Sequence, residues 1–152
     1  MLIDSHCHLD RLDLTPFEGR LEGALEAAAA KGVEHFLCVA VDLERWPAMA
    51  AAMEPFANVS LSVGVHPSEE QGRAPTVEAL LERARHPRVV AIGETGLDYH
   101  YGADSQRRQQ DYFRTHIAAA RACGKPLIIH TREAKADTLG LLREEGADQV
   151  GG

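Results

Sequence analysis

Five short β-rich runs alternate with five helical runs along the chain, and this alternation limits the possible folds more than any other feature. The runs are nearly continuous in apolar residues, which is typical of parallel strands with both faces covered. Regular β-α alternation therefore predicts an α/β fold, a parallel sheet flanked by helices. Strands are predicted at 2–8, 33–41, 58–66, 89–95 and 126–131, and helices at 19–31, 43–54, 76–86, 104–123 and 133–145.

Two architectures fit this alternation. A doubly wound, flavodoxin-like domain would carry its ligand loop after the first strand, and a phosphate-binding version of that loop is rich in glycine. The sequence reads His-Leu-Asp-Arg-Leu-Asp at 8–13 instead. A TIM (β/α)₈ barrel places polar, chemically capable side chains at several strand ends, and those are present, although a whole barrel takes about 250 residues. We therefore expect a partial barrel of about five βα units, with residues 1–152 as one domain.

Composition excludes several classes of protein. The net charge of −7 argues against a protein that coats nucleic acid, but not against an enzyme that acts on a phosphodiester, since bound cations can supply positive charge locally. No apolar stretch is long enough to cross a membrane, and no signal-peptide pattern precedes the first strand. The three cysteines are widely spaced and fit a reducing compartment. The expectation is a cytoplasmic protein with no membrane partner.

Two histidines, separated by a single residue, lie at the end of the first predicted strand. Positions i and i+2 of a strand project from the same face, so His6 and His8 can point at one spot. Paired neutral imidazoles suit a first-row divalent metal. The alternative is a pair of surface histidines near a flexible terminus.

Two later strands end in further candidate ligands. The fourth strand runs into Glu94 between Gly93 and Gly96, which leave the carboxylate little covered; the alternative is a solvated loop glutamate. The fifth strand runs into His130, and Arg132, two residues further on, projects from the same face of the strand. A buried structural histidine and a salt bridge to a helix are the alternatives for these two residues.

The third strand places one more histidine at the same end. Ser60, Ser62, Gly64 and His66 share a face, and in a narrow barrel this face of small residues points inward, which puts His66 at the mouth of the pocket. Three other histidines are predicted to be structural or solvent-exposed, and the loop residues Tyr99 and His100 could contact a substrate. The three histidines are His35, His86 and His116.

Four candidate metal ligands, His6, His8, Glu94 and His130, thus face one pocket from three strand ends. A glutamate among histidines suits the bridging of two cations. Such a pair of metals can activate a water molecule and neutralise the attacking and leaving oxygens of a phosphodiester. The fork of donors on Arg132 suits a phosphate oxygen.

The motifs Asp-Ser-His-Cys-His-Leu-Asp at 4–10, Gly-Val-His-Pro at 64–67, Gly-Glu-Thr-Gly-Leu-Asp-Tyr at 93–99 and His-Thr-Arg-Glu-Ala at 130–134 closely resemble those of the TatD-type metal-dependent deoxyribonucleases, which are TIM-barrel hydrolases. The resemblance implies that His6 and His8 bind one metal, that Glu94 is catalytic and bridges, and that His130 binds the second. It implies two divalent ions (Mg²⁺, Mn²⁺ or Zn²⁺) and hydrolysis of DNA as an exonuclease. His66 and Arg132 are implied as substrate contacts.

The resemblance is incomplete at one end. The family has a further histidine after strand six and an aspartate after strand eight, whereas this sequence ends at Gly152, about where strand six should begin. A five-strand arc exposes two strand edges, so we expect part of a longer protein, or self-association through these edges. The activity of this chain alone is therefore in doubt. Two alternative functions stay open: a C–N hydrolase of the related amidohydrolase group, and a catalytically inactive module.

Overall fold

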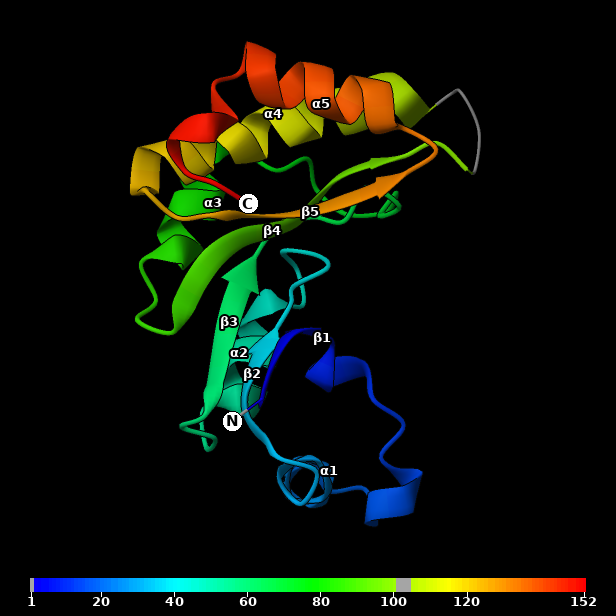
Figure 1. Ribbon diagram of the computed structural model, residues 1–152, viewed down its shortest axis with the longest axis vertical. Helices are drawn as coiled ribbons and strands as arrows, with labels where there is room; N and C mark the ends of the chain where they lie inside the picture. The colour runs from blue at the N-terminus through cyan, green and yellow to red at the C-terminus, as the bar shows by residue number, and fades with distance from the viewer. Residues whose placement is uncertain (1, 101–104) are drawn as a thin grey trace.

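A computed structural model describes residues 2–100 and 105–152 and shows one parallel five-stranded sheet in the order β1-β2-β3-β4-β5. The strands are β1 (Leu2–Cys7), β2 (Val33–Cys38), β3 (Val59–Val63), β4 (Val89–Asp98) and β5 (Leu127–Arg132). The helices are α1 (Leu21–Ala29), α2 (Trp46–Met53), α3 (Val77–Ala84), α4 (Gln106–Cys123) and α5 (Lys135–Glu144). The sheet curves into a half-barrel with the helices on its outer side (Figure 1). The α/β fold of barrel type is confirmed.

The core lies between the sheet and the helices. On α4, Phe113 and Ile117 are one helical turn apart, so they face the same way, and both are fully buried. Ile92 and Leu97 of β4 are also fully buried. Because β4 is paired on both sides, with β3 and β5, and is buried along most of its length, its residues have a fixed position.

Two element boundaries differ from the prediction in an informative way. β4 continues to Asp98, three residues beyond the predicted end, because β5 pairs with it as far as Arg132. α2 begins at Trp46 and not at residue 43, since the carboxylate of Asp42 accepts the backbone N–H of Arg45 at 2.7 Å and ends the preceding turn. The predicted start of the fourth helix, residue 104, lies outside the described residues.

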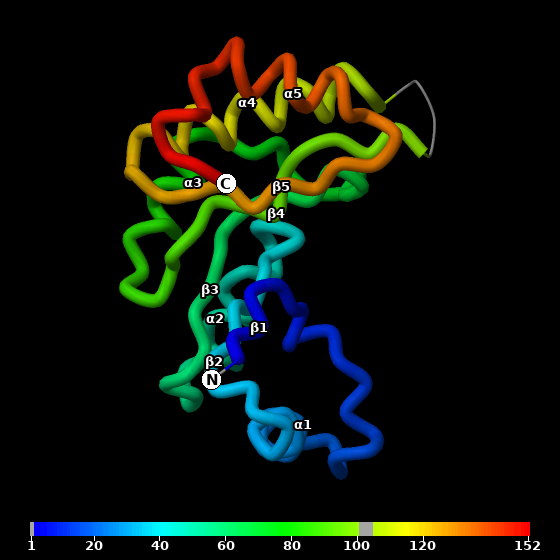
Figure 2. The backbone as a smooth tube through the Cα atoms, in the orientation of Figure 1, coloured from blue at the N-terminus to red at the C-terminus, as the bar shows by residue number. Residues whose placement is uncertain are grey.

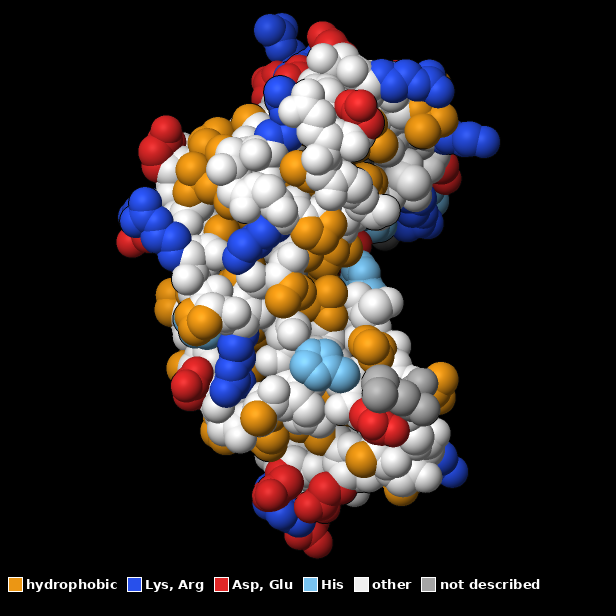
Figure 3. Space-filling model, turned by 60° about the vertical axis from the view of Figure 1, so that its left-hand side comes forward, with side chains coloured by type: hydrophobic (Ala, Val, Ile, Leu, Met, Phe, Trp, Pro, Cys, Tyr) orange, Lys and Arg blue, Asp and Glu red, His pale blue; other side chains and the backbone are white. Residues whose placement is uncertain are grey.

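The sheet has two edge strands, β1 and β5. Leu2 and Ile3 on β1 are 58% and 59% exposed. At the other edge the chain turns back along β5, and the carbonyl of Gly151 accepts the N–H of Leu127 at 3.1 Å (Figure 2). The space-filling view shows hydrophobic side chains along the middle of one face, between its upper and lower parts (Figure 3). No described helix combines the length and apolar character that a membrane crossing requires.

Candidate metal centre

Glu94 is the residue around which the candidate metal centre is built. It lies within the buried part of β4 and is only 6% exposed. Its backbone N–H donates to the carbonyl of Ala40 at 3.1 Å, and the buried hydroxyl of Ser62 donates to the carbonyl of Gly93 at 2.6 Å. These bonds tie the middle of β4 to the segment after β2 and to β3, so the carboxylate is held on a rigid backbone.

The glycines on either side of Glu94 let β5 approach β4 closely. Gly93 has a φ of +146°, and a Cβ there would lie 2.5 Å from the carbonyl oxygen of Ile128. Gly96 has a φ of +129°, and a Cβ there would collide with the carbonyl oxygen of His130. Both positions therefore require glycine, and the close approach brings His130 beside Glu94.

One carboxylate oxygen of Glu94 faces the histidines of β1. The Nε2 atoms of His6 and His8 lie 3.2 Å and 3.7 Å from Oε2 of Glu94. The other ring nitrogen of His8, Nδ1, lies 2.9 Å from the carbonyl oxygen of Val39. A carbonyl only accepts, so Nδ1 of His8 carries the proton and Nε2 keeps the free lone pair that a metal ion needs.

The other carboxylate oxygen of Glu94 faces the histidines of β5 and of the loop after β3. Nδ1 of His130 lies 3.3 Å from Oε1 of Glu94, and Nε2 of His66 lies 3.7 Å from it. The two rings also touch, with 3.2 Å between Nε2 of His66 and Nδ1 of His130. Burial lowers the pKa of His66, although the charge of Glu94 opposes this effect.

The histidines and Glu94 thus form two groups that share the glutamate. His6, His8 and Glu94 form one, and His66, Glu94 and His130 form the other; within each group the ligand atoms lie within 4.8 Å of one another. Imidazole and carboxylate donors at this spacing fit divalent cations. The structure therefore brings together the four predicted ligands and places beside them His66, which the resemblance implied as a substrate contact.

Arg132, the remaining predicted site residue, stays outside both groups. It is exposed at the end of β5, in register with Asp98 of β4. The loop residues Tyr99 and His100 pair with acidic side chains: the hydroxyl of Tyr99 donates to Asp137 at 2.8 Å, and Nδ1 of His100 lies 3.0 Å from Glu133. These residues border the centre and do not enter it.

Asp98 is the site residue that sequence reasoning missed. Its Oδ2 lies 2.9 Å from Nε2 of His130, and its backbone N–H and C=O are both bonded to the side chain of Gln109, at 2.7 Å and 2.8 Å. Burial acts to raise the pKa of Asp98, but hydrogen bonds from His100 and His130 lower it overall. The sequence did contain one indication of this role. Asp98 is an even number of residues beyond Glu94, so the two side chains project from the same face of a strand that continues to Asp98.

Residues predicted to be structural lie away from the centre. His116 is fully buried in α4, where its Nε2 accepts the N–H of Val65 at 2.9 Å and its Nδ1 donates to the carbonyl of Tyr112 at 2.7 Å. Cys7 lies between His6 and His8 in the chain, but its thiol donates to the carbonyl of Leu37 on β2 at 3.3 Å, and burial raises its pKa to about 12, so the thiol stays protonated. Nε2 of His35 contacts the hydroxyl of Ser60 near the starts of the strands.

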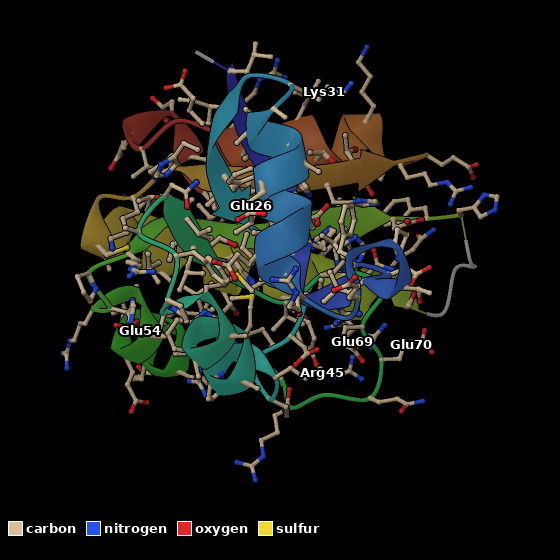
Figure 4. All side chains as sticks on the ribbon, turned by 90° about the horizontal axis from the view of Figure 1, so that it is seen from below. Glu26, Lys31, Arg45, Glu54, Glu69 and Glu70 are labelled. Atoms are coloured by element: carbon tan, nitrogen blue, oxygen red, sulfur yellow. The ribbon has the colours of Figure 1, made fainter. Side chains whose placement is uncertain are left out.

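Several acidic side chains lie on elements away from the centre. Figure 4 shows four acidic side chains, Glu26, Glu54, Glu69 and Glu70, on α1, at the end of α2 and in the loop after β3. In the space-filling view the molecule is indented on one side, and histidine side chains are visible in that indentation (Figure 3). The indentation thus contains imidazoles, while basic and acidic side chains are interspersed over the rest of the visible face.

Comparison with known proteins identifies the family. The family described as TatD related DNase matches residues 3–152. The chain belongs to the TatD family. Among curated relatives of this TatD-family chain, the uncharacterized metal-dependent hydrolase YcfH of Escherichia coli K12 is 44% identical over 151 residues, covering 99% of the chain and 57% of YcfH. TatD of Mycobacterium tuberculosis, which has the same description, is 39% identical, with 96% and 57% covered.

Solved structures show the same likeness. The crystal structure of YjjV, a TatD homologue from Escherichia coli K12, matches with a TM-score of 0.81 at 27% identity, covering 96% of this TatD-family chain and 56% of YjjV. A TatD-family hydrolase from Entamoeba histolytica shares the fold, with a TM-score of 0.75. The chain therefore spans little more than half the length of the relatives it matches.

Proposed function

We propose that this TatD-family chain contributes to a divalent-metal-dependent hydrolase that cleaves phosphodiester bonds in DNA, as an exonuclease. The observation that carries the proposal is the pair of ligand groups that share Glu94. Relatives described as metal-dependent hydrolases and the DNase description of the family support it. Residues 1–152 would form one domain of barrel type, acting in the cytoplasm.

In this proposal His6 and His8 hold one divalent ion, His130 holds a second, and Glu94 bridges them as the catalytic carboxylate. Mg²⁺, Mn²⁺ and Zn²⁺ are all compatible with imidazole and carboxylate ligands. When bound, such a pair supplies an activated water and positive charge for the phosphate oxygens. The chain itself provides the rigid strand ends that keep the ligands together.

Arg132 and His66 are the proposed substrate contacts. Arg132 stands at the end of β5 next to the centre, and a guanidinium matches the geometry of a phosphate. The overall charge of −7 does not oppose DNA binding at this spot, because bound cations would offset it locally.

A C–N hydrolase of the amidohydrolase group is the other enzyme to consider. That group commonly has a modified lysine as the metal bridge on strand four, whereas this chain has Glu94 there. The carboxylate at the bridging position favours the phosphodiesterase.

The test is to titrate the chain with Mn²⁺ and with Zn²⁺ by calorimetry and to follow nucleotide release from a single-stranded oligonucleotide. We expect two ions for each chain and a loss of affinity of about 100-fold or more in Glu94→Gln, since the bridge serves both sites and even outer-shell partners matter 10- to 100-fold. Nucleotide release should be lost with the metal.

Glu26→Gln is the matched control, because Glu26 lies on the outside of α1 (Figure 4). This variant should bind metal as the unsubstituted chain does. No binding at micromolar metal would contradict the proposal and support an inactive module. Turnover of cyclic amides without nuclease activity would support the amidohydrolase alternative.

A further inference from the structure

The proton positions on the rings around Glu94 divide the histidines into two kinds. Nδ1 of His8 faces the carbonyl of Val39, and Nε2 of His130 faces the carboxylate of Asp98. Carbonyls and carboxylates accept hydrogen bonds, so each of these nitrogens carries a proton. In both rings the nitrogen that faces Glu94 is therefore the one with the free lone pair, which is the arrangement of a metal ligand.

His66 has the opposite arrangement. The backbone N–H of Ser68 donates to Nδ1 of His66 at 3.1 Å, and the hydroxyl of Ser68 lies 2.6 Å from the same nitrogen. A backbone N–H can only donate, so Nδ1 of His66 is the acceptor and carries no proton. The proton of the neutral ring must then be on Nε2, the atom that faces the centre.

An N–H cannot bind a cation. Nε2 of His66 lies 3.2 Å from Nδ1 of His130, whose lone pair can accept its proton, and 3.7 Å from Oε1 of Glu94. Distance alone would group His66 with the metal ligands. The hydrogen bond from Ser68, only two residues further along the chain, excludes that role as long as it persists.

We propose that His66 is a fixed hydrogen-bond donor to the substrate and not a metal ligand, with Ser68 holding its proton on Nε2. This inference rests on the proposed function for its substrate, a phosphodiester. Once the Nδ1 lone pair of His130 is used for a metal ion, the N–H of His66 loses that acceptor. A non-bridging phosphate oxygen is an acceptor of the right chemistry to replace it.

The first experiment measures the ring nitrogens directly. The imidazole ¹⁵N signals of the metal-free chain, observed by NMR, should show His66 protonated at Nε2 with Nδ1 as a hydrogen-bond acceptor. His8 should be protonated at Nδ1. A proton on Nδ1 of His66 would overturn the proposal, whether or not the chain binds metal or cleaves DNA.

The second experiment separates a ligand from a donor. His66→Ala and His66→Gln should bind as many Mn²⁺ ions as the unsubstituted chain, whereas His8→Ala should lose affinity. A single-stranded DNA oligonucleotide with Mn²⁺ present is the second probe. Its affinity should fall roughly tenfold to hundredfold in His66→Ala, the range for a hydrogen bond to a charged group, and recover largely in His66→Gln, which restores an N–H.

His35→Gln is the control, because His35 lies near the starts of the strands and should change neither quantity. Loss of a metal ion in both His66 variants would make His66 a ligand and overturn the inference. Unchanged DNA affinity in His66→Ala would also overturn it. Absence of metal and DNA binding by the unsubstituted chain would contradict the proposed function, while the ¹⁵N signals would still decide the state of His66.

Discussion

Asp98 determines which nitrogen of His130 faces Glu94. Its carboxylate accepts from Nε2 of His130, so Nδ1 is left as the free lone pair at 3.3 Å from Glu94. Asp98 is itself held at both backbone polar groups by Gln109 of α4. If His130 held a metal ion through Nδ1, Asp98 would be the outer carboxylate that orients this ligand.

We predict that Asp98→Ala lowers metal affinity by about 10- to 100-fold, because His130 loses the partner that fixes its ring. Asp98→Asn should keep much of the affinity, since its amide oxygen still accepts from Nε2. Calorimetric titration with Zn²⁺ measures both. Equal affinities for all three chains would show that Asp98 does not position His130.

Sequence reasoning reached the ligands more easily than the residues that orient them. His6, Glu94 and His130 lie in the second half of a strand and His8 directly follows one, so strand geometry alone predicted that these candidate ligands meet. The contact between Asp98 and His130 depends on how far β4 and β5 pair, which the apolar pattern of β4 did not show. The hydrogen bond from Ser68 to His66 depends on a loop conformation, which the alternation of side chains along a strand does not predict.

At the level of elements, the pairing of β4 with β5 depends on Gly96. A side chain there would meet the carbonyl of His130 in a backbone conformation that other residues rarely adopt. We predict that Gly96→Ala lowers the free energy of unfolding by about 2 to 4 kcal/mol and weakens metal binding. Urea unfolding and calorimetry measure the two effects.

Gly140→Ala is the matched control for this prediction. Gly140 lies within α5, and a Cβ there meets nothing within 4 Å. Alanine should stabilise the helix by up to about 1 kcal/mol and leave metal binding unchanged. If both variants behaved alike, close packing at Gly96 would not be the cause.

His116 joins α4 to the segment that follows β3, and burial lowers its pKa to about 4. Its pKa in the unfolded chain is about 6.5, so above that pH the ring is neutral in both states and costs nothing. Between pH 6.5 and 4 the unfolded chain binds the extra proton first, so stability falls as the pH falls. We predict a loss of about 2 kcal/mol from this ring between pH 7.5 and 5.

Urea unfolding at several pH values checks this prediction with His116→Gln as the comparison. The glutamine variant has no ring to protonate, so its stability should fall less over the same interval, whatever its stability at pH 7.5. Parallel curves for the two chains would show that protonation of His116 does not contribute.

The order and type of the elements were predictable because each has a strong apolar pattern and a clear stop, such as Gly124 after α4. Their ends were less predictable. α2 begins late because Asp42 bonds to the backbone ahead of it, and such a local bond changes a boundary without changing the apolar pattern.

For the whole molecule, the open sheet is the feature with a measurable consequence. β1 and β5 are the edge strands of the described sheet, and an edge strand can pair with another chain; Ile3 and Leu139 are exposed near these edges. We predict that the chain self-associates, and that Ile3→Lys combined with Leu139→Lys shifts it towards the monomer. Light scattering after size-exclusion chromatography measures the mass, with Leu12→Lys in the loop after β1 as the control.

A stable, monodisperse monomer for the unsubstituted chain would contradict this prediction. Association that persists in the double variant would place the contact elsewhere on the surface. The Leu12 variant separates the edges from exposed leucines in general, since Leu12 is as exposed as Leu139 but lies in a loop.

The separation of the candidate ligands along the chain determines when the centre can form during translation. His6 and Glu94 are 88 residues apart, and a ribosome adds about 5 to 20 residues each second. The histidines of β1 therefore exist for about 4 to 18 s before their carboxylate partner is made. A centre that includes both the histidines of β1 and Glu94 can therefore form only after Glu94 has been made, and the histidine pair is without this carboxylate until then.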